Sequence, residues 1–119
     1  MTFRHHPARR VALLVALAAP AAGLTAMHAA SAVPARTQTV SIKMFAFTPQ
    51  VLTVTPGTTV TWANADEDPH TVTANDKSFH SAALDTDDKF SFTFTKPGDY
   101  AYFCTLHPHM TGKIIVKAG

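Results

Sequence analysis

The sequence predicts an all-β domain, an antiparallel β-sandwich or barrel, after residue 38. Apolar and polar residues alternate with a period of two in several short segments, most clearly at Phe90, Phe92 and Phe94. Such alternation is typical of strands that bury one face. Pro-Gly pairs at residues 56–57 and 97–98 mark turns between these segments. No segment after residue 38 has a convincing helical pattern, so two sheets packed face to face are expected.

The first 32 residues predict a secretory signal peptide. Arginines precede an apolar run at residues 11–22, and Ala30-Ser31-Ala32 forms an A-x-A cleavage site. A retained membrane anchor is the alternative, but the largely apolar residues 11–27 fall short of the roughly 20 that a spanning helix needs. We therefore expect an exported protein, periplasmic or extracytoplasmic, with no stable membrane insertion after cleavage.

Cleavage after Ala32 would leave 87 residues, enough for one small domain. Within it, residues 33–38 are expected to form a flexible lead-in and residues 39–119 the folded domain. The whole chain has a net charge of +2, but removal of the first 32 residues takes away three arginines and leaves seven basic against eight acidic residues. The mature domain is then close to −1. It lacks the basic surface of a nucleic-acid-binding protein, and no nucleic-acid partner is expected.

Strand-like segments follow one another along the expected domain. They are residues 39–44, 52–55, 59–62, 71–73, 89–95, 100–103 and 113–117. Trp62 and the phenylalanines of the fifth segment are expected to fill the core between the sheets. Residues 75–88 carry four Asp without clear periodicity and are predicted to be a loop with at most one short strand.

Residues 104–110 read Cys-Thr-Leu-His-Pro-His-Met and hold a thiolate, two imidazoles and a thioether. Two His and one Cys around the metal, with a distant axial Met, form the ligand set of a one-electron copper site. The segment supplies the Cys, the Met and either His107 or His109. His70, in Asp-Pro-His-Thr-Val, is the candidate from outside the segment.

Each of these residues also has an ordinary structural interpretation. Taken singly, a lone Cys or Met in a β protein is usually an apolar core residue. Cys104 is the only cysteine, so it cannot form an internal disulfide. Zinc also binds Cys and His, but structural zinc sites prefer more thiolates, and a thioether ligand favours copper. The combination of residues therefore predicts one copper ion.

The chain resembles the cupredoxin family of small type 1 (blue) copper proteins, and among them the amicyanins. The resemblance covers about residues 40–118. It rests on four motifs: Phe-x-Phe-x-Pro at 45–49, Pro-Gly-x-x-Val-x-Trp-x-Asn at 56–64, Asp-Pro-His-Thr-Val at 68–72, and Pro-Gly-x-Tyr-x-Tyr-x-Cys-x-x-His-Pro-x-Met-x-Gly at 97–112. The short Cys-x-x-His-x-x-Met spacing is that of the amicyanin loop.

The resemblance implies a Greek-key β-sandwich with one type 1 copper ion. Carried over by position, it makes His70, Cys104 and His107 the equatorial ligands and Met110 the axial ligand. His109 is then expected to be an exposed loop residue. Relatives often have Asn after the first His, where its side chain ties the two ligand loops together; here that residue is Thr71, whose hydroxyl is expected to do part of this work.

The resemblance further implies an electron carrier that cycles between Cu(II) and Cu(I), and no enzyme. Its partners would be redox proteins such as a cytochrome, a dehydrogenase or an oxidase, and the protein is expected to be a monomer. The acidic group Asp66, Glu67 and Asp68 either steers a basic partner or is a solvated turn. A copper-delivery module is the alternative function, because His109 lies beside the loop. Delivery sites, however, are usually open and rich in Met or His.

Overall fold

The computed structural model of the protein describes residues 12–23 and 36–119. Within the second range all regular elements are strands, which confirms the all-β prediction. They are β1 (Thr37–Lys43), β2 (Ala46–Thr48), β3 (Val51–Val54), β4 (Thr58–Asn64), β5 (Thr73–Ala74), β6 (Lys89–Phe94), β7 (Gly98–Phe103) and β8 (Thr111–Val116).

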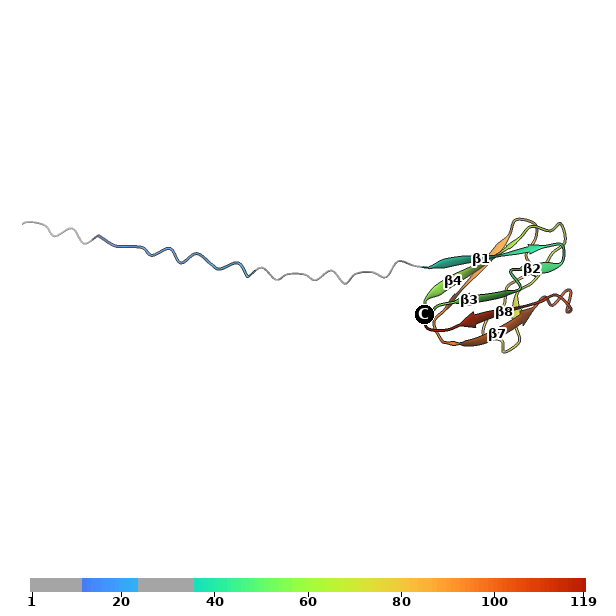
Figure 1. Ribbon diagram of the computed structural model, residues 1–119. Helices are drawn as coiled ribbons and strands as arrows, with labels where there is room; N and C mark the ends of the chain where they lie inside the picture. The colour runs from blue at the N-terminus through green and yellow to red at the C-terminus, as the bar shows by residue number, and fades with distance from the viewer. Residues whose placement is uncertain (1–11, 24–35) are drawn as a thin grey trace, which may run out of the picture. The chain divides into compact units, whose positions relative to one another are not determined.

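The strands form two four-stranded sheets, in the orders β2-β1-β4-β6 and β3-β8-β7-β5. Figure 1 shows them as two facing layers, with β2 and the loop after β7 at the same end of the sandwich. The sheets are mixed, since β1 pairs with β4 and β3 with β8 in parallel, while the other pairs are antiparallel as predicted. The reason is the path of the chain. Because β3 lies in the other sheet, β4 returns beside β1 in the same direction, and side-chain alternation carries no signal for this choice.

The core lies between the two sheets, around Trp62, which is fully buried. Phe94 and Tyr102 are also buried against it, and Phe90 and Phe92 pack on the cluster from partly exposed positions. This confirms the predicted aromatic core. Phe79 joins it from residues 75–88, stacking on Trp62 with ring centroids 5.7 Å apart. That segment is a loop, as predicted, but it contributes an aromatic anchor that its sequence pattern did not reveal.

The first strand differs from its prediction at both ends. It begins at Thr37, so the last two residues of the expected lead-in pair with β4 through their backbone while their side chains stay exposed. It ends at Lys43, one residue before the predicted end. Met44 and Phe45 have positive φ angles of 52° and 56° and turn the chain into β2. Met44 therefore leaves the apolar face of the strand and is 81% exposed.

Residues 12–23 form no helix or strand and are exposed. The predicted signal peptide otherwise lies outside the described residues, as do residues 33–35 of the expected lead-in. Among the described residues there is no helix that is long and apolar enough to cross a membrane.

Candidate metal centre

Two loops at one end of the sandwich carry the predicted metal ligands. The loop between β4 and β5 carries His70, and the loop between β7 and β8 carries Cys104, His107 and Met110. Because each loop leaves and re-enters a strand of the core, its ends are fixed by sheet hydrogen bonds. The candidate site is thus supported by regular structure on both sides.

The loop after β7 is closed by its own backbone. The Cys104 N–H donates to the Met110 carbonyl (3.0 Å), the His107 N–H to the Cys104 carbonyl (3.3 Å), and the Met110 N–H to the His107 carbonyl (2.9 Å). The three predicted ligands of this loop are thus the residues that its hydrogen bonds join. Pro108 adds stiffness, because its ring fixes its own φ and restricts His107 before it.

The buried Asn64 organises the other loop. Its side-chain amide donates to the carbonyls of Asp68 and Leu84, both at 2.9 Å, and its oxygen accepts the Asp66 N–H. His70 then forms an isolated bridge with Leu84 through two backbone hydrogen bonds. As a result the fully buried His70 side chain is held against the second ligand loop.

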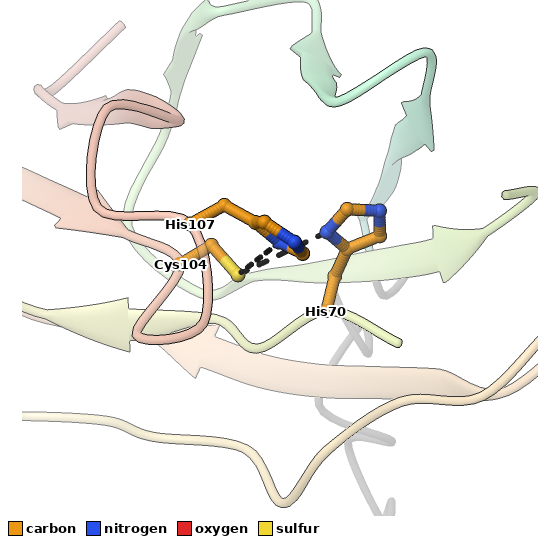
Figure 2. Close-up of side chains that lie close together, drawn as sticks. All are labelled: His70, Cys104 and His107. Atoms are coloured by element: carbon orange, nitrogen blue, oxygen red, sulfur yellow. Dashed lines mark hydrogen bonds between the residues drawn. The ribbon is translucent and has the colours of Figure 1, made fainter. Parts of the chain in front are cut away.

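His70, Cys104 and His107 bring one ligand atom each to within 4.8 Å of one another. Figure 2 shows both imidazoles directed at the Cys104 sulfur, with His70 Nδ1 at 3.9 Å and His107 Nδ1 at 3.7 Å. Metal bonds to such donors are about 2.0–2.3 Å long, so two donors on a trigonal ion lie roughly 3.7 Å apart. The spacing therefore suits a single small ion.

The remaining predicted positions also have clear environments. Met110 is only 5% exposed and closes the same loop through its backbone. His109 is exposed and is outside the group formed by the three ligand atoms. The prediction that His109 is a surface residue is confirmed. Either His was possible from composition alone, and the fold brings His107 to the cysteine.

The Cys104 thiol is buried but strongly stabilised as a thiolate. Burial acts to raise its pKa, whereas the hydrogen bond from the Thr71 N–H, the polar contacts with the two neighbouring imidazoles and the Leu106 N–H lower it, and the pKa falls to about 6. The Thr71 N–H lies 3.3 Å from the sulfur. A thiolate is the form that binds a metal ion, so the protein prepares this ligand for binding near neutral pH.

Asp66 is the residue whose role the sequence did not reveal. Its place beside Glu67 and Asp68 suggests a steering charge or a solvated turn. In the structure its side chain is only 12% exposed, and its Oδ2 lies 2.8 Å from His70 Nε2. The N–H groups of Met44 and Phe45 also donate to it, at 2.6 and 3.0 Å. Although partial burial acts to raise it, the pKa of Asp66 is lowered by these backbone and imidazole hydrogen bonds. The available signal was a carboxylate four residues before the predicted ligand.

Comparison with known proteins agrees with this geometry. A family model for the cupredoxin-like domain matches residues 11–116. The chain belongs to the cupredoxin-like family. It is 40% identical to amicyanin from Paracoccus versutus over 95 residues, 75% of this chain and 71% of that protein. It is 34% identical to amicyanin-alpha from Methylorubrum extorquens over 115 residues, 92% of this chain and 95% of that protein. The structure of an oxidised amicyanin variant superposes with a TM-score of 0.65 at 32% identity, covering 71% of this chain and 86% of that one.

Membership of this family confirms the predicted Greek-key sandwich and the predicted cofactor, one type 1 copper ion. The donor set fits that ion. It combines the Cys104 sulfur and one nitrogen each from His70 and His107 with the thioether of Met110 on the same loop as Cys104, and this combination favours copper over zinc, calcium or magnesium. When bound, copper supplies a one-electron redox couple, and the protein supplies a fixed set of donors around it.

Proposed function

We propose that this protein is an exported blue copper electron-transfer protein, with His70, Cys104 and His107 as equatorial ligands and Met110 as the axial ligand. The observation that carries the proposal is the convergence of the three donor atoms, all within 4.8 Å, from two loops held by backbone hydrogen bonds. A site that keeps its donors in place in both oxidation states needs little reorganisation when an electron enters or leaves. The closed loop around Cys104 and the Asn64 contacts serve this purpose.

Electrons would enter and leave through the exposed edge of His107. This residue is partly exposed, and its ring packs edge-on against the ring of Phe45. Met44 is 81% exposed, and Phe45 and Leu106 are 49% exposed. We call the surface formed by Met44, Phe45, Leu106 and the His107 edge the His107 face. Transient redox complexes are small, so an apolar face of this size suits a partner that binds and leaves quickly.

The exposed charges of the other ligand loop support a particular kind of partner. Glu67 and Asp68 are exposed on the loop that carries His70, and their charges favour a redox protein with a positively charged docking surface. A cytochrome, a dehydrogenase or an oxidase would meet this description. The association rate should fall with ionic strength, which stopped-flow reduction of the protein by candidate partners would measure.

Export and the monomeric state are separate parts of the proposal. The N-terminal pattern of arginines, an apolar run and Ala30-Ser31-Ala32 supports export with cleavage after Ala32. Mass spectrometry of the protein recovered from a periplasmic extract should give a chain that begins at Val33. Light scattering coupled to size-exclusion chromatography should give the mass of one mature chain.

The visible spectrum after addition of Cu(II) tests the function. A thiolate–copper(II) bond should give an intense band toward the red end and a blue protein, which becomes colourless on one-electron reduction. Cys104→Ser and His107→Ala should abolish the band. His109→Ala is the matched control, since it removes an exposed imidazole from the same loop and should leave the spectrum unchanged. A colourless Cu(II) protein would reject the electron carrier, and tight Cu(I) binding without colour would favour the delivery module.

A further inference from the structure

We propose that Asp66 is the positioning residue of the centre: its one carboxylate fixes the tautomer of His70 and the turn that carries Phe45, and so lowers the reduction potential. This inference rests on the proposed function, because the potential is that of a bound copper ion. The part that concerns the chain alone, the tautomer of His70, is independent of copper.

The first contact of Asp66 selects the ligand atom of His70. A carboxylate only accepts hydrogen bonds, so the 2.8 Å contact between Asp66 Oδ2 and His70 Nε2 places the imidazole proton on Nε2. In the neutral imidazole the lone pair is then on Nδ1, the nitrogen that faces the Cys104 sulfur at 3.9 Å. An imidazole with this tautomer is ready to bind a metal without losing or moving a proton.

The second contact holds the turn between β1 and β2. Met44 and Phe45 both adopt left-handed backbone angles, which cost energy for residues with a side chain. Their two N–H groups point to the Asp66 carboxylate, at 2.6 Å to Oδ1 and 3.0 Å to Oδ2. The charged acceptor strengthens these bonds and offsets the strain of the turn.

The turn between β1 and β2 also places Phe45 against the candidate metal centre. Its ring packs edge-on against the rings of His70 and His107, with ring centroids 5.3 and 5.0 Å apart. The same ring is half exposed on the His107 face. Asp66 thus links three features through one side chain: the orientation of a ligand, the packing over both imidazoles, and part of the docking surface.

The charge of Asp66 should also act on the metal. A carboxylate hydrogen-bonded to a ligating imidazole makes the ligand more electron-rich, and this favours the more highly charged Cu(II) state. Asp66 itself is held in place, because its N–H donates to Asn64 and its carbonyl accepts from Thr86. Removing the charge should therefore raise the reduction potential.

The experiment compares Asp66→Asn with Asp68→Asn. Both variants remove one negative charge from the same loop, but Asp68 is exposed. Voltammetry should show a clear rise in potential for Asp66→Asn and a much smaller change for Asp68→Asn. Asp66→Glu, which restores the carboxylate, should recover part of the shift. Equal shifts in the two Asn variants would mean a general charge effect and overturn the proposal.

A second measurement begins with the copper-free wild-type protein, so its first result depends neither on the folding of a variant nor on copper chemistry. Nitrogen-15 NMR of the histidine rings should show His70 protonated on Nε2, with that proton protected from exchange. The protected signal should be lost in Asp66→Asn and kept in Asp68→Asn. A His70 proton on Nδ1 in the wild type would overturn the proposal. A wild-type protein that is not blue would instead reject the proposed function and leave the tautomer result standing.

Discussion

The side-chain oxygens of Thr71 and Thr105 lie 2.8 Å apart and join the two loops that carry the candidate ligands. The backbone N–H of Thr105 also donates to the Thr71 hydroxyl, at 2.7 Å, and the Thr71 N–H reaches the Cys104 sulfur. One threonine thus does the work that the family resemblance assigns to an Asn at this position. The Thr71 hydroxyl accepts the hydrogen bond of the Thr105 N–H, while the Thr71 N–H donates to the Cys104 sulfur.

Thr71→Val should destabilise the copper-free protein by about 1–3 kcal/mol, because it keeps the shape of the side chain and leaves the Thr105 N–H without its acceptor. Chemical denaturation monitored by tryptophan fluorescence would measure the loss. Thr71→Ser, which keeps the hydroxyl, is the control and should stay close to the wild type. Equal stability of the Val and Ser variants would show that the hydroxyl does not tie the loops.

Thr71→Asn should raise the reduction potential of the copper protein. The Thr71 hydroxyl lies 3.9 Å from the Cys104 sulfur, a long contact, and an amide N–H would be a better donor to the thiolate. A stronger hydrogen bond withdraws charge from the sulfur and so favours Cu(I). Voltammetry would detect the change against the Thr71→Ser control. An unchanged potential would show that the residue at position 71 joins the two loops without tuning the potential of the metal.

The sequence predicted the parts of this protein that depend on side-chain type and period. Alternation located most of the strands, and the spacing of Cys104, His107 and Met110 predicted a closed loop of candidate ligands. Which strands pair in parallel was not predictable, because both sheets bury alternate residues whatever the direction of their neighbours. Phe79 was missed for a related reason. It reaches the core from a loop that has no period at all.

Asp66 shows a different kind of gap. Its identity and its place four residues before His70 are plain in the sequence, but three consecutive acidic residues look like a solvated turn. What separates Asp66 from Glu67 and Asp68 is the left-handed turn at Met44 and Phe45, which brings two N–H groups to its carboxylate. These positive φ angles occur at residues other than glycine, so the local sequence does not predict the turn.

The copper-free protein should become more stable as the pH rises from about 6 to 9. The lower limit is the pKa of Cys104 in the folded protein, and the upper limit is the ordinary pKa of a cysteine thiol. In this range the unfolded chain binds a proton that the folded chain has released, so the free energy of unfolding rises with pH, by at most about 1.4 kcal/mol per pH unit from this group. The contribution is complete above pH 9 and is lost as the pH falls through 6.

Chemical denaturation of the copper-free protein at a series of pH values would measure this slope, and the ultraviolet absorbance of the thiolate would report its titration directly. Cys104→Ser is the control, since it keeps the histidines and carboxylates and removes only the thiol. Its stability should lack the part of the slope that belongs to Cys104. Identical slopes for both proteins would show that the hydrogen bonds at the sulfur do not outweigh its burial.

Met110→Leu should raise the reduction potential and leave the fold intact. Leucine fills a similar volume in this buried position but removes the thioether, and the axial ligand tunes the potential of such copper sites. Met44→Leu is the matched control, because it makes the same change at an exposed residue of the His107 face. Voltammetry of the two variants should separate them. A shift in Met44→Leu alone would count against Met110 as the axial ligand.

Gly112→Ala should destabilise the protein by about 1–3 kcal/mol, the usual cost of an extra methyl group in a tightly packed core. A Cβ at Gly112 would lie 2.8 Å from Cε2 of Tyr102 and closer still to Cζ and the hydroxyl. The Tyr102 ring cannot retreat, because it packs edge-on against Trp62 and Phe47 with ring centroids 5.5 and 4.7 Å apart. Thermal unfolding of the copper-free protein would show the loss.

Lys113→Ala, on the opposite face of β8, should change the melting temperature much less. In a Tyr102→Phe background the cost of Gly112→Ala should shrink, because the hydroxyl that meets the new methyl group is gone. The same cost in both backgrounds would place the strain somewhere other than at this contact.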